Sequence, residues 1–203
     1  MRVIILAGGP GNRLAGYAKA LIPFGPQRLV QWHGKVFSSL GWPWWVVAYP
    51  WWAKEIEPFV PGHTIASSKG QAGRALAAMW SADNYLLLEE DVLFDPRLLN
   101  EWDGSFAAWV GEQESCDKVD VQDGRILGKG GNVAFLGALF IPAHLVAKAR
   151  SLFERNPGAD CLDALGSLLA EEPLRPWFVR NVININTQKD SLRAHMDLWP
   201  LVK

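Results

Sequence analysis

Cysteine is scarce in this sequence of 203 residues, and neither sign of charge is in excess. The two cysteines, Cys116 and Cys161, lie far apart without Cys-x-x-Cys or Cys/His spacing, which argues against a structural zinc site and favours reduced core residues. The net charge of −1 gives no sign of a surface that coats nucleic acid or binds an anionic membrane. Composition therefore removes nucleic acid and membranes from the expected partners.

Long apolar runs are also missing. No segment approaches the roughly 20 apolar residues that a membrane-spanning helix needs. The first apolar run, residues 3–7, is too short for the core of a signal peptide and leads directly into a glycine-rich turn. No internal repeat, low-complexity tract or Ser/Pro-rich linker divides the chain. We therefore expect a cytoplasmic protein with one domain over residues 1–203, large enough to bury a core without disulfide or metal staples.

What the sequence does contain is an alternation of strand and helix patterns. The first strand, Arg2–Ala7, is a continuous β-branched and apolar run, typical of parallel strands buried on both faces. Further strands are expected at 44–48, 63–66, 84–88, 105–110, 118–121, 126–128, 133–141 and 178–185, and the main helices of the first half at about 28–40, 52–59 and 70–80. Gln122-Asp123-Gly124-Arg125 predicts a hairpin turn. The predicted fold class is a single three-layer α/β/α sandwich, with a mostly parallel Rossmann-like sheet and a hairpin addition in the second half.

Tryptophan is unusually abundant, with eleven residues that are concentrated in Trp42-Pro43-Trp44-Trp45 and Trp51-Trp52. We expect most of them in the core, because large aromatic side chains bury much apolar area. The alternative for an exposed minority is stacking on a ligand base or the contact face of a homodimer.

The strongest chemical signal directly follows the first strand. It reads Leu6-Ala7-Gly8-Gly9-Pro10-Gly11-Asn12-Arg13-Leu14, with Lys19 six residues beyond Arg13. Glycines let the backbone turn sharply and bring its N–H groups close to a polyphosphate. Arg13 and Lys19 supply fixed positive charge where a pentavalent phosphorus develops negative charge. The loop is not a P-loop, since no Gly-Lys-Ser/Thr follows, and it lacks the Gly-x-Gly-x-x-Gly of dinucleotide-binding folds.

Together with Lys19-Ala20-Leu21-Ile22-Pro23, this loop resembles the signature of the nucleotidyltransferase superfamily. That group includes sugar-phosphate nucleotidyltransferases, molybdenum cofactor guanylyltransferases and phosphocholine cytidylyltransferases. Three later segments are similar to the family's base-recognition turn, metal-binding element and closing segment, so the resemblance spans nearly the whole chain. They are Lys69-Gly70-Gln71-Ala72-Gly73-Arg74-Ala75, Glu89-Glu90-Asp91-Val92-Leu93-Phe94-Asp95 and Ile183-Asn184-Ile185-Asn186-Thr187-Gln188-Lys189-Asp190.

The resemblance implies a Mg²⁺-dependent enzyme that moves a nucleoside monophosphate from an NTP to a phosphorylated small-molecule acceptor and releases pyrophosphate. Arg13 and Lys19 would be catalytic, because they would stabilise the transferring and leaving phosphates. Asp91 would hold Mg²⁺ with help from Asn186, a donor set that suits a cation with few protein ligands beside phosphate oxygens and water. The nucleotide would contact Leu6, Ala7, Gly8, Gly9, Gly11, Lys69, Gln71 and Gly73.

The sequence departs from the family pattern at two places. Glu90 replaces the glycine that usually precedes the metal-binding aspartate, and Asn184 and Asn186 stand at positions that are often acidic. Asparagine at these positions also resembles the molybdenum cofactor type, so the amide oxygen of Asn186 is retained as the expected second metal ligand. Lys69 and Arg74 are interpreted as surface charges, and only Lys69 is retained as a site candidate because it adjoins the turn.

Two other functions stay open at this point. One is a metal-dependent glycosyltransferase that uses Glu89-Glu90-Asp91 to bind a sugar nucleotide. The charges of Arg13 and Lys19 argue against it, because glycosyl transfer releases no pyrophosphate. The other is a non-catalytic nucleotide-binding subunit, which the two asparagines leave open. The base of the NTP and the identity of the acceptor phosphate are open as well.

Overall fold

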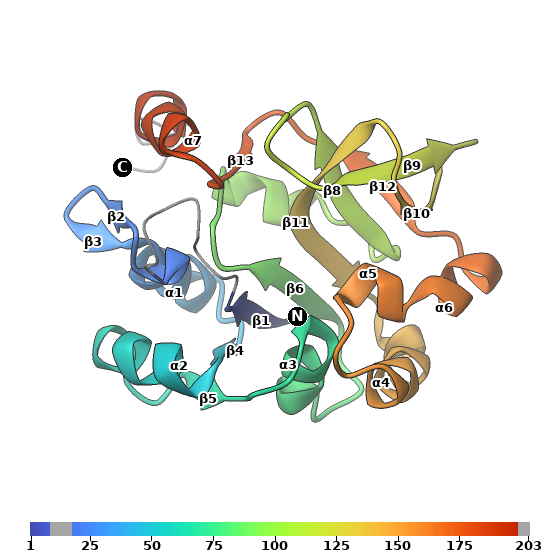
Figure 1. Ribbon diagram of the computed structural model, residues 1–203, viewed down its shortest axis with the longest axis horizontal. Coiled ribbons are helices and arrows are strands. Elements are labelled where there is room, and N and C mark those ends of the chain that lie inside the picture. Colours follow the sequence, from blue (N-terminus) through green and yellow to red (C-terminus); the bar gives the residue numbers. More distant parts are fainter. Residues whose placement is uncertain (9–17, 199–203) are drawn as a thin grey trace.

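A central sheet with helices on both faces organises the chain (Figure 1). The computed structural model describes residues 1–8 and 18–198. Within these residues the main sheet is formed by β1 (Arg2–Ala7), β4 (Trp44–Ala48), β5 (Thr64–Ala66), β6 (Tyr85–Glu89), β8 (Ala107–Gly111), β9 (Lys118–Gln122), β10 (Arg125–Lys129), β11 (Val133–Ile141) and β12 (Arg175–Phe178). Their order is β10-β9-β11-β6-β1-β4-β5, with β8 beside β11 and β12 beside β8.

Strand β1 lies at the centre of the parallel half of the sheet. It pairs in parallel with β4 on one side and β6 on the other, and β5 extends the sheet beyond β4. Val3, Ile4 and Ile5 are fully buried, as a parallel strand covered on both faces requires. Val3 and Ile5 belong to one apolar core and Ile4 to the other, so a core lies on each side of the sheet. The predicted three-layer arrangement is confirmed.

The helices divide between these two cores. Helices α1 (Leu29–Ser39) and α2 (Pro50–Ile56) pack on one face. Helix α7 (Gln188–Arg193) continues into the π-helical segment η6 (Ala194–Leu198), which joins the same core. The other face is covered by α3 (Gln71–Ala78), α4 (Val146–Arg155), α5 (Cys161–Ala164) and α6 (Gly166–Glu171). Short elements connect them: η2 (Lys19–Leu21), β2 (Pro23–Phe24), β3 (Gln27–Arg28), η3 (Glu57–Phe59), η4 (Pro96–Glu101) and η5 (Ala143–Leu145).

Side chains that the sequence placed in the core are found there. Both cysteines are buried and unpaired, which confirms their expected place. Trp44 and Trp109 are buried, whereas Trp51 and Trp80 are more than half exposed. A homodimer contact through the exposed tryptophans stays a prediction. Across residues 1–8 and 18–198, every helix is too short or too polar to cross a membrane.

The second half of the chain adds antiparallel strands, as the sequence predicts. Strand β11 runs antiparallel to β6, β8 and β9, and β9 forms a hairpin with β10. Asp123 and Gly124 at the hairpin turn have φ angles of 48° and 71°. Two-residue hairpin turns favour Asp-Gly because both central residues take positive φ.

The predicted single strand at 178–185 is wrong, because this segment changes sheets. Strand β12 ends at Phe178 and pairs in parallel with β8. Strand β13 (Val182–Asn184) instead pairs with β7 (Val92–Phe94) in a separate two-stranded sheet. Arg180 and Asn181 lie between the two strands, but their presence in the sequence does not by itself reveal such a change of partner. The change has a consequence for function, since β7 begins directly after Asp91 and its pairing brings Asn184 to that residue.

Gly34, in the middle of α1, should not tolerate even alanine. A Cβ at Gly34 would lie 2.6 Å from the indole of Trp44, which is buried and donates to Ser38 Oγ at 3.1 Å. Alanine in a helix is favoured over glycine by about 1 kcal/mol, so this contact is what opposes the substitution. We expect Gly34→Ala to lower the free energy of unfolding by about 1–3 kcal/mol in urea titrations, as overpacking does. Gly166→Ala is the matched control, because a Cβ there meets nothing within 4 Å; equal stability of the two variants would contradict the prediction.

Candidate active site

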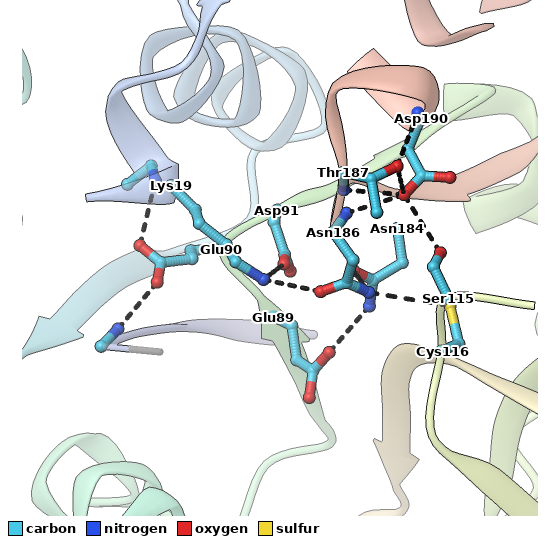
Figure 2. Close-up of polar contacts among 12 residues, drawn as sticks. Lys19, Glu89, Glu90, Asp91, Ser115, Cys116, Asn184, Asn186, Thr187 and Asp190 are labelled. Carbon is cyan, nitrogen blue, oxygen red and sulfur yellow. Dashed lines mark hydrogen bonds and ion pairs between the residues drawn. The ribbon is translucent and has the colours of Figure 1, made fainter. Parts of the chain in front are cut away.

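Three of the predicted site residues meet at the carboxyl end of β6. Lys19 begins η2, Asp91 lies between β6 and β7, and Asn186 follows β13. The Lys19 Nζ forms an ion pair with Asp91 Oδ2 and donates a hydrogen bond of 2.7 Å to Asn186 Oδ1 (Figure 2). Asp91 is 4 % exposed. An ammonium group therefore occupies the point at which a carboxylate oxygen and an amide oxygen converge.

The surroundings of Lys19 keep it charged. Burial disfavours the ammonium form, but the charge of Asp91, assisted by Glu90 and Glu89, outweighs burial and raises the pKa of Lys19 above its ordinary value. A cation held in a partly buried site attracts an anion more strongly than one in water, because the effective dielectric constant is lower. Lys19 is thus held as an ammonium at the end of β6, paired with the Asp91 carboxylate.

Glu90 joins the two ends of that loop. Its buried carboxylate accepts the N–H of Gly8 at 2.9 Å through Oε1 and the N–H of Ala20 at 3.0 Å through Oε2. Burial and then the negative charge of Asp91 raise the pKa of Glu90 to about 7, while the two N–H donors favour the ionised form. The sequence showed Glu90 only as a departure from the family's glycine. In the fold it fixes where the loop leaves β1 and where it returns.

Side-chain amides connect Glu89 to Lys19. Glu89 accepts from Gln71 Nε2 at 3.0 Å and from Asn184 Nδ2 at 2.9 Å, and Asn184 Oδ1 accepts from Asn186 Nδ2 at 2.9 Å. Burial is the main reason that the pKa of Glu89 is raised to about 7, and the two amide donors oppose this rise. An acid at position 184 would place another negative charge beside Glu89, whereas an amide donates to it. An asparagine at position 184 therefore suits the glutamate that it contacts.

A second layer of polar groups fixes the backbone of the closing segment. Gln113 Oε1 accepts the Asn184 N–H at 3.1 Å, and Gln113 Nε2 donates to the Asn184 carbonyl. Asp190 Oδ2 accepts the N–H groups of Asn186 at 3.1 Å and Thr187 at 2.8 Å. Thr187 Oγ1 in turn accepts the Asp190 N–H at 3.2 Å, which caps α7. These bonds hold Asn186 at the position where it meets Lys19.

The polar network lines a cleft along the carboxyl edge of the sheet. One cavity of about 190 Å³ is bordered by Lys19, Asp91 and Asn186 together with Leu6 and Gln71. Leu6 and Gln71 also border an adjoining cavity of about 70 Å³. Open α/β sheets bind ligands at this edge, so the cleft is the candidate substrate site.

Comparison with known proteins identifies the architecture. No family model and no curated protein matches the sequence. The structure is similar to CTP:phosphocholine cytidylyltransferase from Streptococcus pneumoniae, with a TM-score of 0.77 and 12 % identity over 96 % of this chain and 97 % of that chain. For the inositol-1-phosphate CTP transferase from T. maritima the TM-score is 0.72 and the identity 16 %, over 99 % of this chain and 94 % of that chain. For UDP-glucose pyrophosphorylase from Acinetobacter baumannii the TM-score is 0.70 and the identity 15 %, over 96 % of this chain and 91 % of that chain. The chain has the nucleotidyltransferase fold.

The sequence of the glycine-rich loop resembled that of nucleotidyltransferases, and the fold that this resemblance implied is the one observed. Leu6 and Gly8 lie at the carboxyl end of β1, and both are buried. Gly8 has a φ of +147°, and a Cβ there would lie 2.8 Å from the Tyr49 ring, so only glycine fits. Three predicted residues lie outside the residues that the structure describes, and their roles stay predictions: Gly9, Gly11 and Arg13.

The predicted base-recognition turn opens α3 and packs against the segment before α5. Gln71 Oε1 accepts the Cys161 N–H at 3.0 Å, so both amide atoms of Gln71 have partners within the chain. The Gly73 N–H donates to the Pro157 carbonyl at 3.1 Å, and a Cβ on Gly73 would lie 2.8 Å from the same oxygen. Packing therefore accounts for this glycine. Contact of Gln71 and Gly73 with a nucleotide base stays a prediction, with Gln71 on the wall of the cleft.

The interpretation of Arg74 as a surface charge is wrong. The side chain is 5 % exposed, not solvated, and it borders the larger cavity. Its Nη1 donates to the Lys69 carbonyl at 3.0 Å, and its guanidinium lies 4.6 Å from the centre of the Tyr49 ring. The Lys69 side chain itself is exposed, and its contact with the nucleotide stays a prediction. The groups that cover Arg74 come from distant parts of the sequence, so local pattern gave no signal of its burial.

Gly137, in β11, is expected to be essential to the polar network. Its φ is +76°, and a Cβ there would lie 2.6 Å from Val92 Cγ2, 2.8 Å from Glu89 Oε2 and 3.0 Å from Asn184 Nδ2. Gly137→Ala should separate this hydrogen-bonded pair and cost about 1–3 kcal/mol beyond the backbone strain of an alanine at positive φ, which is about 1–2 kcal/mol. Gly130→Ala, with a φ of +98° and nothing within 4 Å of the added Cβ, measures the strain alone. Equal losses of melting temperature in the two variants would contradict the prediction.

Proposed function

We propose that this chain is a Mg²⁺-dependent nucleotidyltransferase that moves a nucleoside monophosphate from an NTP to the phosphate of a small-molecule acceptor. The observation that carries the proposal is the convergence of Lys19, Asp91 and Asn186 beside the glycine-rich loop. The similar structures are a cytidylyltransferase for phosphocholine, a CTP transferase for inositol 1-phosphate and UDP-glucose pyrophosphorylase. Their names support a phosphorylated small molecule as the acceptor.

Asp91 and Asn186 are the residues that would hold Mg²⁺. Their side-chain oxygens already converge on a cation, the Lys19 ammonium, and both are hard oxygen donors of the kind that Mg²⁺ takes. In the described part of the chain no group of three or more His, Cys, Asp or Glu side chains is arranged to hold a metal. Such a sparse protein ligand set fits an ion that is completed by triphosphate oxygens and water. When bound, Mg²⁺ would neutralise charge on the phosphates.

The reaction requires orientation and charge more than proton transfer. An oxygen of the acceptor phosphate attacks the α-phosphorus of the NTP, and the bond from that phosphorus to the α,β-bridging oxygen breaks. Pyrophosphate leaves with the electron pair. Because the acceptor phosphate is already anionic, no general base is needed. Lys19, with Arg13 from the loop, would neutralise the negative charge that develops on the transferred and leaving phosphates.

Glu90 would act on this reaction through the loop. By accepting the N–H groups of Gly8 and Ala20, it ties down both ends of the segment that carries Arg13 and Lys19. Fixing these two ends lowers the conformational freedom that is lost when Lys19 binds a phosphate. Glu90 is therefore proposed as a positioning residue and Lys19 as a catalytic one.

Lys19→Met should remove most of the activity. Loss of the ammonium is expected to lower kcat by about 10²–10³-fold, the usual cost of removing one charge-stabilising donor. The measurement is pyrophosphate release with each of the four NTPs, Mg²⁺, and phosphocholine, inositol 1-phosphate or glucose 1-phosphate as acceptor. Lys148→Met is the matched control, since this exposed lysine pairs with Glu171 at 3.2 Å on the outside of α4.

Two results would count against the proposal in different ways. A near-normal kcat in Lys19→Met would refute the role assigned to Lys19. Metal-dependent NTP binding by the wild-type protein, with no pyrophosphate released for any acceptor, would favour a nucleotide-binding subunit over an enzyme.

A further inference from the structure

Arg74 carries a buried positive charge that the mechanism above does not use. It lies near the start of α3 and borders the same cavity of about 190 Å³ as Lys19. Among the residues that the structure describes, no carboxylate forms an ion pair with its guanidinium, and its buried Nε has no hydrogen-bond partner. Within the described residues the guanidinium thus has no direct ion pair, although the carboxylates of Glu89, Glu90 and Asp91 border the same cavity.

Two contacts hold the guanidinium without neutralising it. Nη1 donates to the Lys69 carbonyl at 3.0 Å, and Cζ of the guanidinium lies over the Tyr49 ring, 4.6 Å from its centre. A cation above an aromatic face recovers only part of what burial costs. The orientation of Arg74 is thus fixed at some expense of stability. Charged groups kept under such conditions are typical of ligand-binding sites.

The position of Arg74 relates it to the donor nucleotide. A Cβ built on Gly8 would lie 3.2 Å from Arg74 Cζ, so the guanidinium lies against the first glycine of the loop. Leu6, two residues earlier, borders the same cavity. A guanidinium offers only hydrogen-bond donors. A hydrogen-bond partner of the guanidinium must therefore be an acceptor, and a nucleotide presents acceptors as phosphate oxygens, ribose oxygens, and the carbonyl oxygens and ring nitrogens of its base.

We propose that Arg74 binds an oxygen acceptor of the donor nucleotide at the end of β1 and so determines part of the affinity for the NTP. This inference rests on the proposed function, since it takes the cleft to be the NTP site. It differs from a structural role in one measurable respect. Removing a buried charge that has no direct ion pair should leave the stability of the free protein little changed, whereas removing a structural arginine should destabilise it.

Two variants separate the charge from the shape of the side chain. Arg74→Met keeps a long apolar stem against Tyr49 and removes the charge. Arg74→Lys keeps the charge and loses the planar fork of donors. Arg175→Met is the matched control, because this exposed arginine pairs with Asp103 and does not border the cavity beside Lys19.

The experiment is titration calorimetry with Mg²⁺ and, as probes, CTP, UTP, GTP, ATP and inorganic tripolyphosphate, together with melting temperatures of the free proteins. We expect Arg74→Met to bind the preferred NTP at least about tenfold more weakly, as loss of a charge-assisted hydrogen bond does. Arg74→Lys should lose less, and Arg175→Met nothing. An equal loss for all NTPs and tripolyphosphate assigns a phosphate oxygen, and an equal loss for all NTPs with none for tripolyphosphate assigns a ribose oxygen. A loss confined to CTP, UTP and GTP, whose bases carry carbonyl groups, assigns the base.

Unchanged affinity of Arg74→Met for every probe would overturn the inference, as would a lowered melting temperature with unchanged affinity. Should Arg74→Met fail to fold, Arg74→Lys decides: weaker binding at the wild-type melting temperature supports the inference, and unchanged binding overturns it. A wild-type protein that binds none of the probes would instead contradict the proposed function.

Discussion

The ammonium group of Lys19 is held by oxygens from two distant parts of the chain, and the geometry of the site follows from that contact. Lys19 lies 72 residues from Asp91 and 167 residues from Asn186 in sequence. Pairing of β7 with β13 brings the last two together, and the Ile185 N–H donates to the Asp91 carbonyl at 2.8 Å. Backbone pairing therefore fixes both oxygens, and a cation completes their arrangement.

Three consecutive acids, Glu89, Glu90 and Asp91, lie at the end of β6, where their negative charges repel one another. Each is compensated by a different kind of donor: Glu89 by side-chain amides, Glu90 by backbone N–H groups, and Asp91 by an ammonium. The pKa values of both glutamates are nevertheless raised to about 7, first by burial and then by the charge of Asp91. A strand end with this much negative charge favours cations, which is consistent with a metal that binds together with a triphosphate.

The sequence predicted the parts of the fold that depend on local pattern. Continuous apolar runs predicted the parallel strands, and Asp123-Gly124 predicted the hairpin. The family resemblance assigned Lys19 and Asp91 to one reaction, and the structure places them together. The sequence did not predict features that depend on which distant segments pack together. The change of sheet between β12 and β13 and the burial of Arg74 under Tyr49 are both of this kind.

The central claim is the proposal that Asp91 and Asn186 hold the metal while Lys19 neutralises the phosphates. It is tested most directly by a crystal structure with a non-hydrolysable NTP analogue and Mn²⁺ in place of Mg²⁺. We expect an anomalous peak at about 2.1 Å from the Asp91 carboxylate, with Asn186 beside it and the Lys19 Nζ on a phosphate oxygen. A metal bound elsewhere, with Lys19 still paired to Asp91 while the nucleotide is present, would contradict it.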